Sequence, residues 1–237
     1  MILAYLLHRE TVEIIERDDG LIDISKVLPY YFSDYSQWMP AERRAIRLAR
    51  GRVLEVGCGA GRVCLYLQRK GMDVTGIDIS PGAIEVCRKR GVRKAIVLPI
   101  ERINSFKQDS FDTVVMFGNN FGLLGNSKKA KTLLKRMHRI TSRDAVVLAG
   151  TRDPYKTRDP VHLAYHKLNR SRGRMAGQLR IRTRYKQYVG NWVDYLFVSK
   201  KEMRGILSGT GWKVRQFINE NGPLYVAVIA KESHRPA

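Results

Sequence analysis

The sequence is poor in cysteine and in long apolar runs. Only 3 of its 237 residues are cysteines, and Cys58, Cys64 and Cys87 have neither Cys-x-x-Cys spacing nor the Cys/His spacing of a metal site. A disulfide scaffold is therefore excluded, and we expect reduced thiols and a cytoplasmic location. The apolar run Met1–Leu7 lacks a basic n-region and a cleavage site, so we expect no signal peptide. No run approaches the roughly 20 apolar residues of a membrane span, so we expect no membrane partner.

Acidic residues are also scarce, with 22 Asp and Glu against 43 Lys and Arg, for a net charge of +21. Residues 1–50 carry 7 basic and 8 acidic side chains, so the excess falls in the rest of the chain. The segment Lys167–Lys186 contains eight basic residues and no acid. Such a field favours anionic partners, and RNA is one candidate. A solvated basic surface without a ligand is the open alternative.

Strand-like and helix-like segments alternate from residue 52 to residue 150. Short runs rich in Val, Ile and aromatic residues predict five strands, at residues 53–56, 73–78, 94–98, 111–117 and 145–149. A helix is expected after the first strand, ending near residue 70, and another after the second strand, ending near residue 90. A third helix is expected to start at residue 127, after the fourth strand. This order predicts an α/β fold with a doubly wound, Rossmann-like sheet covered by helices on both faces.

Residues 151–198 break this alternation. Leu179–Tyr185 alternates with period two and Asn191–Val198 is a second strand candidate, so we expect a small antiparallel β insertion after the fifth strand, over one edge of the sheet. A helix begins again at Ser199, and an antiparallel strand pair ends the chain. The predicted organisation has three parts. Residues 1–50 form an N-terminal helical cap, residues 51–150 and 199–237 form the cofactor-binding core, and residues 151–198 form an insertion on the substrate side.

A glycine-rich turn follows the first predicted strand of the core. Its spacing is Gly-x-Gly-x-Gly, at residues 57, 59 and 61, and not the Gly-x-Gly-x-x-Gly of dinucleotide-binding proteins. Glu55 precedes the turn and would repel a pyrophosphate, whereas Asp78 ends the next strand, where a carboxylate reaches ribose hydroxyls. A ligand with a ribose, a cationic group and no phosphate fits these residues better than NAD.

This segment resembles the class I S-adenosylmethionine-dependent methyltransferases, of the type 11-like kind. The resemblance is strong over residues 50–150 and weaker over residues 199–231. It implies a seven-stranded sheet with the last strand antiparallel, and S-adenosyl-L-methionine as the cofactor. It also implies that the methionine part is held by Glu55, Gly57, Gly59 and Gly61. Asp78 would bind the ribose, and Ile79 would lie against the adenine.

Two departures from the family pattern leave roles open. The stretch Val97–Glu101 is apolar where an acid normally holds the adenine amino group, so Glu101, or the backbone of Pro99 and Ile100, would have to serve. The run Phe117–Gly122 resembles the Gly-Asn-Ser-Phe run of glycine-type small-molecule N-methyltransferases. Asn119 or Asn120 would then orient the acceptor amine or the cofactor, and capping of a turn is the alternative for either.

The acceptor side offers weaker signals. His162 and His166 follow the fifth strand and are candidate general bases, with a structural or exposed histidine as the alternative, and no metal site is expected. Alternation in the insertion puts three arginines on one face, where they would either bind a carboxylate or phosphate or form a solvated edge strand: Arg180, Arg182 and Arg184.

The leading functional prediction is methyl transfer to a nucleophilic nitrogen or oxygen of a small molecule, with an anionic and a neutral acceptor both left open. The alternatives are an RNA or protein methyltransferase that uses the basic surface, and a regulator that binds S-adenosylmethionine without turnover.

Overall fold

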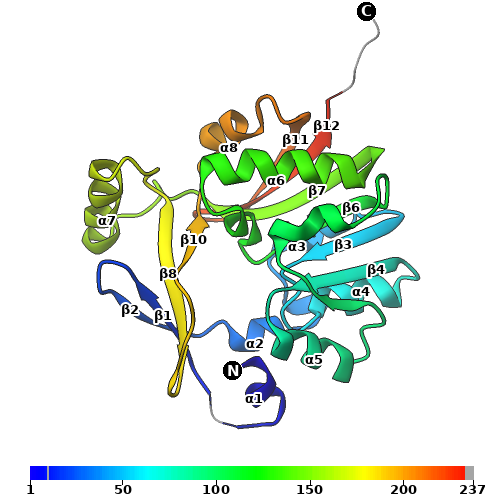
Figure 1. Ribbon diagram of the computed structural model, residues 1–237, viewed down its shortest axis with the longest axis horizontal. Helices are drawn as coiled ribbons and strands as arrows, with labels where there is room; N and C mark the ends of the chain where they lie inside the picture. Colours follow the sequence, from blue (N-terminus) through cyan, green and yellow to red (C-terminus); the bar gives the residue numbers. More distant parts are fainter. Residues whose placement is uncertain (10, 233–237) are drawn as a thin grey trace, which may run out of the picture.

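A seven-stranded sheet forms the centre of the protein, as a computed structural model that describes residues 1–9 and 11–232 shows (Figure 1). Neighbouring strands are parallel from β5 to β7, and β12 is antiparallel to both β7 and β11. The predicted Rossmann-like sheet with a final antiparallel strand is thus confirmed. In spatial order the strands are β11 (Trp212–Asn219), β12 (Leu224–Lys231), β7 (Thr141–Arg152), β6 (Phe111–Met116), β3 (Arg52–Val56), β4 (Asp73–Asp78) and β5 (Ala95–Val97).

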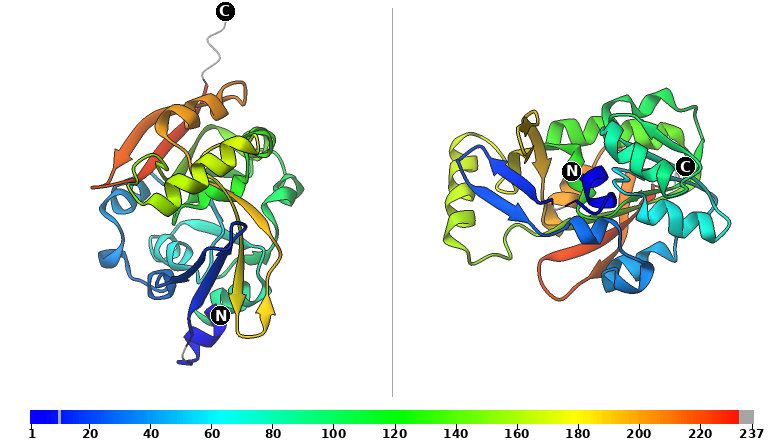
Figure 2. Two further views of the ribbon diagram at one scale, coloured as in Figure 1. Left: turned by 90° about the vertical axis from the view of Figure 1, so that its left-hand side faces the viewer. Right: turned by 90° about the horizontal axis from the view of Figure 1, so that it is seen from below.

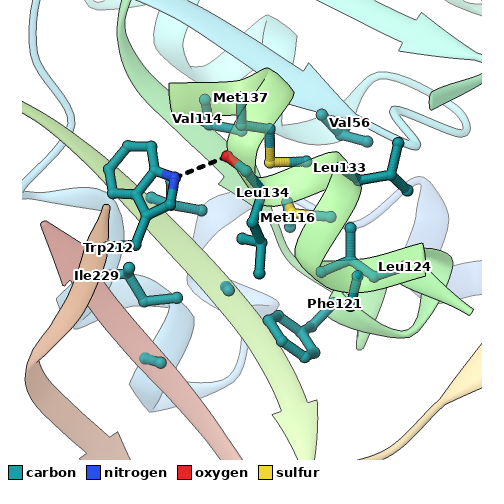
Figure 3. Packing of buried hydrophobic residues seen from close by; sticks show 14 of the residues in the cluster. Val56, Val114, Met116, Phe121, Leu124, Leu133, Leu134, Met137, Trp212 and Ile229 are labelled. Carbon is teal, nitrogen blue, oxygen red and sulfur yellow. Dashed lines mark hydrogen bonds between the residues drawn. The ribbon is translucent and has the colours of Figure 1, made fainter. Parts of the chain in front are cut away.

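One face of this sheet packs against α6 (Ser127–Ile140) and α8 (Lys200–Leu207). The apolar residues of α6 recur at helical spacing, so Leu133, Leu134 and Met137 all point into the core with Met116 of β6 (Figure 3). Trp212 at the start of β11 is 1% exposed, and its indole nitrogen donates a hydrogen bond of 2.9 Å to the carbonyl of Leu134. This bond satisfies the one polar atom of the largest side chain in the core.

The opposite face packs against α3 (Pro40–Ile46), α4 (Arg62–Arg69) and α5 (Pro81–Lys89). Val63 and Leu67 of α4 and Ile84 of α5 are buried there among the β-branched residues of the strands. Ser80 caps α5 by accepting a hydrogen bond from the amide of Ala83, as the Ser-Pro pair predicts. Helices therefore cover both faces of the sheet, which places the loops at the carboxyl ends of its strands along one open edge.

A second, smaller sheet contains the predicted β insertion. Its order is β10 (Val193–Leu196), β8 (Gln178–Tyr185), β1 (Glu13–Arg17) and β2 (Ile22–Ser25), all antiparallel, with β9 (Tyr188–Val189) paired to β8. The expected antiparallel insertion is confirmed. Because β8 has β10 on one side and β1 on the other, the interpretation of β8 as an edge strand is wrong.

Two features of this region differ from the expectations. Residues 1–50 form α1 (Ile2–Leu6), α2 (Leu28–Tyr31), the short 3-10 turn η1 (Tyr35–Gln37) and α3, but they also contribute β1 and β2, so this segment is not wholly helical. A helix, α7 (Pro160–Ser171), lies beside the smaller sheet and far from α4 and α5 (Figures 1 and 2). It was not predicted because only Tyr165, His166 and Asn169 of its residues are buried, which leaves too narrow an apolar stripe.

Two 3-10 turns complete the open edge of the large sheet: η2 (Ile100–Ser105) after β5 and η3 (Asn120–Leu124) after β6. None of the helices in the described part of the chain is long and apolar enough to cross a membrane.

Candidate cofactor and acceptor site

The glycine turn between β3 and α4 adopts backbone conformations that favour glycine. Gly57, Gly59 and Gly61 have φ values of +71°, +54° and +77°. A Cβ atom at Gly57 would lie 2.6 Å from the side-chain nitrogen of Asn120, and one at Gly61 would lie 2.8 Å from Val92. A Cβ atom at Gly59 would meet nothing within 4 Å. The turn is thus packed on both flanks and open at its middle residue, where a ligand can approach the backbone.

Asp78, at the end of β4, lies directly beside this open residue. One carboxylate oxygen accepts a hydrogen bond of 2.9 Å from the amide of Gly59, and the other accepts one of 2.9 Å from the amide of Ser80. Burial raises the pKa of Asp78. Each carboxylate oxygen retains a lone pair for a ligand hydroxyl. Ile79, which follows, is 70% exposed and offers an apolar surface next to this carboxylate.

The two other predicted acids have contacts of their own. Glu55 is 5% exposed and accepts a hydrogen bond of 2.8 Å from the amide of Cys64 in the first turn of α4, and burial raises its pKa to about 7. Glu101, in η2, forms an ion pair of 2.5 Å with Lys129 of α6. Glu55 thus supports the glycine turn from beneath, while Glu101 is directed toward α6. Their roles toward the methionine part and the adenine stay predictions.

The end of β6 meets the glycine turn through two consecutive asparagines. Asn120 donates hydrogen bonds of 2.9 Å to the carbonyls of Val56 and Gly57, which ties η3 to the turn. Asn119 has a φ of +68°, and its side-chain oxygen is buried without a hydrogen-bond partner among the described residues. That side chain lines a cavity of about 10 Å³, together with Glu42 and others, with room for about one water molecule.

The structure has a buried ion pair beside the glycine turn that was not predicted from the sequence. Glu42 of α3 is 1% exposed and accepts hydrogen bonds from Arg62 (2.7 Å), from the hydroxyl of Tyr30 (2.8 Å) and from the amide of Gly118 (2.9 Å). The Arg62 guanidinium lies 4.4 Å from the ring centre of Tyr30 and 4.6 Å from that of Trp38. Its Nη1 atom is buried without a partner in the described residues. The position of Arg62 after the third glycine was an available signal, whereas nothing in the sequence singles out Glu42.

The N-terminal segment and the smaller sheet close over the same edge. The hydroxyl of Tyr195 in β10 donates a hydrogen bond of 2.8 Å to the carbonyl of Asn119. Tyr31 of α2 donates one of 3.5 Å to Glu13 of β1. Burial raises the pKa of Tyr31, and the nearby Glu13, Tyr195 and Asp78 raise it further. Tyr31, Glu13 and Tyr195, which come from α2, β1 and β10, are therefore close to one another and near Asp78.

The two predicted histidines lie on α7, in different surroundings. The ring of His166 is 7% exposed and lies 6.0 Å from that of Tyr155, and burial lowers its pKa. The Nδ1 atom of His162 lies 3.4 Å from the hydroxyl of Thr157. Within the described part of the chain, neither histidine contacts the glycine turn or Asp78. Their role as bases stays a prediction.

The three predicted anion-binding arginines of β8 already have acidic partners. Arg182 donates two hydrogen bonds of 2.8 and 2.9 Å to Glu16 of β1, and Arg184 bonds to the same carboxylate. These bonds lower the pKa of Glu16 to about 2. Arg180 pairs with Asp194 of β10 at 3.2 Å. The anion expected from a substrate is thus supplied by the protein itself, and substrate binding by this face stays a prediction.

Comparisons with known proteins converge on one domain type. Residues 54–149 match the family described as methyltransferase domain. A methyltransferase from Bacteroides fragilis, solved in complex with S-adenosyl-L-homocysteine, superposes with a TM-score of 0.82 at 24% identity, over 98% of this chain and 93% of the other.

Two curated relatives match shorter segments. An S-adenosyl-L-methionine-dependent Diels-Alderase from Talaromyces variabilis is 48% identical over 26% of this chain and 20% of its own length. A ubiquinone biosynthesis O-methyltransferase from Xanthomonas oryzae pv. oryzae is 36% identical over 28% of this chain and 30% of its own length. The chain spans about half the length, or less, of the curated relatives it matches.

Proposed function

We propose, from the premise that the chain belongs to the class I S-adenosylmethionine-dependent methyltransferases, that it moves a methyl group from S-adenosyl-L-methionine to a nitrogen or oxygen of a small molecule. The observation that carries this proposal is the carboxylate of Asp78, held by the amide of Gly59 at the open middle of the glycine turn. A ribose needs such an acceptor pair, and a nucleoside needs the free backbone face beside it.

The residues present fit the rest of the cofactor as well. The exposed side chain of Ile79 suits one face of the adenine. The unpartnered Nη1 atom of Arg62 suits the carboxylate of the amino-acid tail, because a buried donor gains most from a charged acceptor. When bound, S-adenosylmethionine supplies a methyl group that is already activated by the sulfonium charge. The protein then has to align a nucleophile and exclude water.

The surroundings of the acceptor side suit that task. Tyr195 is bonded to the carbonyl of Asn119, and Tyr31 is near enough to Asp78 for the charge of that carboxylate to raise its pKa, so both rings are available to an acceptor beside Asp78. If the acceptor arrives protonated, a base is also needed within hydrogen-bond reach. Glu13, which accepts from Tyr31, is a further candidate for this base besides the histidines of α7, and burial raises its pKa.

Two other functions each have one observation in their favour. The net charge of +21 favours an RNA or protein substrate bound on the basic surface. The similarity of one segment to a Diels-Alderase that depends on S-adenosylmethionine favours cofactor binding without methyl transfer. The cytoplasmic location also stays a proposal, supported by the three free, buried cysteines.

Calorimetry with S-adenosylhomocysteine tests the cofactor site. Asp78→Ala removes two charge-assisted hydrogen bonds, each worth roughly 1.5 to 3 kcal/mol, so we expect affinity to fall about 100-fold or more. Asp73→Ala is the matched control, because Asp73 begins the same strand at the opposite end and pairs with Lys94 on the surface. Equal affinity of wild type and Asp78→Ala, with both proteins folded by their melting curves, would remove the ribose assignment.

A labelling experiment tests the acceptor class. The protein is incubated with methyl-labelled S-adenosylmethionine and a cell extract, which is then separated into metabolite, RNA and protein fractions. The proposal expects label in the metabolite fraction. Label in RNA or protein would establish the second function, and cofactor binding without label in any fraction would establish the third.

A further inference from the structure

Arg152 is the last residue of β7, at the same edge of the large sheet as Asp78 and Asn119. Its guanidinium lies 5.4 Å from the ring centre of Phe197, which follows β10. It also influences Tyr195, since the charge of Arg152 lowers the pKa that burial raises. Because the Tyr195 hydroxyl is bonded to the carbonyl of Asn119, Arg152 lies on the acceptor side of the site.

No acid of the described residues neutralises this arginine. Among residues 1–9 and 11–232 its side chain forms neither an ion pair nor a hydrogen bond, and its Nε atom is buried without a partner. Burial lowers the pKa of Arg152, which reports the cost of holding the charge away from water. Arg152 as a whole is half-buried, and a partly desolvated guanidinium with an unsatisfied Nε atom is able to bind an anion from outside the chain.

The other arginines of the region show that pairing was available. Arg62 has Glu42, Arg180 has Asp194, and Arg182 has Glu16. All three cations pair with an acid of the same chain, whereas Arg152 lies beside the ring of Phe197 and near Tyr195. Each arginine of β8 has a carboxylate partner, with Glu16 shared by Arg182 and Arg184, whereas the cation at the end of β7 has no ion-pair partner among the described residues.

We infer that Arg152 binds an anionic group of the methyl acceptor, so the substrate is a small molecule that carries a carboxylate or a phosphate. The inference rests on the proposed function and adds the substrate class to it. A planar guanidinium suits either anion through two parallel hydrogen bonds. The rings of Phe197 and Tyr195, whose centres are 5.6 Å apart, lie beside Arg152, and they favour a flat, apolar body attached to the anion.

The test fractionates the metabolites of an extract by anion exchange before incubation with methyl-labelled S-adenosylmethionine. Wild type is expected to label the retained, anionic metabolites. Alkaline phosphatase treatment of that fraction separates the two sources, because it removes the acceptor if the anion is a phosphate monoester and leaves it if the anion is a carboxylate. Arg152→Met is expected to lower the labelling rate at least tenfold, with unchanged affinity for S-adenosylhomocysteine.

Arg204→Met is the matched control. Arg204 also lies over a phenylalanine ring, at 4.7 Å from the centre of Phe217, but it is exposed on α8 and away from the site, so labelling should be unchanged. A thermal melt adds a second readout: Arg152→Met should be at least as stable as wild type, whereas an arginine with a purely structural role would destabilise on removal.

The outcomes separate the two proposals. Label confined to unretained, neutral metabolites, or an undiminished rate with Arg152→Met, overturns the role of Arg152 and leaves methyl transfer to small molecules standing. Absence of label from every metabolite fraction overturns both. Label in anionic metabolites that depends on Arg152 and not on Arg204 supports both.

Discussion

Arg62 and Arg152 lie in two regions that border the same edge of the large sheet, and the two regions treat a positive charge differently. Around Arg62, the N-terminal segment supplies Glu42, and the ion pair of 2.7 Å is enclosed by the rings of Tyr30 and Trp38. Around Arg152 the smaller sheet supplies a ring face and no acid. The first region pairs its cation with an acid of the protein, although the Nη1 atom of Arg62 has no partner among the described residues, and the second region has no acid for its cation.

The difference teaches where the chain provides rigidity and where it leaves room for a variable partner. The Arg62 region links α3, α4 and the end of β6, because Glu42 also accepts from the amide of Gly118. A cofactor of fixed chemistry benefits from such a preorganised setting. The Arg152 region depends on a ligand to complete its electrostatics, as expected for the side that selects the acceptor.

The largest expected effect breaks the comparison at its paired member. Glu42→Ala leaves the Arg62 cation buried without a counter-ion and deprives the Gly118 amide of its acceptor, so the free energy of unfolding should fall by about 3 to 5 kcal/mol. Urea denaturation measures it. Glu42→Gln keeps the acceptor oxygen and should lose less. If Glu42→Ala lost less unfolding free energy than Glu42→Gln, the charge of Arg62 would be no better compensated than the charge of Arg152.

The cofactor region was the part that the sequence made predictable. Its signals are local: the glycines at 57, 59 and 61 lie within five residues, and Asp78 ends the next strand, so the βαβ order alone brings them together. The alternation of strands and helices predicted the sheet for the same reason. Glu55 stands at the expected place, but local reasoning could not foresee that its carboxylate would accept from the amide of Cys64.

The acceptor region was less predictable because its partners come from distant segments. Period-two alternation correctly grouped Arg180, Arg182 and Arg184, yet their acids Glu16 and Asp194 lie on other strands, and β1 joins β8 across more than 160 residues. Arg152 drew no attention since an arginine at a strand end is ordinary in sequence. What distinguishes it is an Nε atom that is buried with no hydrogen-bond partner in the described part of the chain.

The pH dependence of stability sharpens the comparison, because it tests whether the charge of Arg62 also stabilises the ionised form of Glu55. Burial raises the pKa of Glu55 from 4.5 to about 7, although the charge of Arg62 lowers it. The folded state then binds this proton more tightly than the unfolded state, so the contribution of Glu55 to stability is fully present below pH 4.5 and is lost as the pH rises to 7. At about 1.36 kcal/mol per pKa unit, the Glu55 contribution amounts to about 3 kcal/mol.

Subtracting the pH profile of Glu55→Gln from that of wild type isolates this contribution. The glutamine keeps an acceptor for the Cys64 amide and does not titrate. Parallel profiles between pH 4.5 and 7 would mean that Glu55 stays ionised, and hence that Arg62 stabilises a second carboxylate besides Glu42.

The smallest expected effect concerns an arginine that is paired but exposed. Arg180 is 41% exposed in its side chain, and its bond of 3.2 Å to Asp194 is open to water and salt. Exposed pairs contribute at most about 1 kcal/mol, so Arg180→Ala should lower the free energy of unfolding by less than that. The difference from wild type should shrink further in 1 M NaCl, where the Debye length is only about 3 Å. A large loss of unfolding free energy that does not change with salt would show that the Arg180 pair behaves like the enclosed pair of Arg62. Burial alone would then not explain why Arg152 differs from the paired arginines.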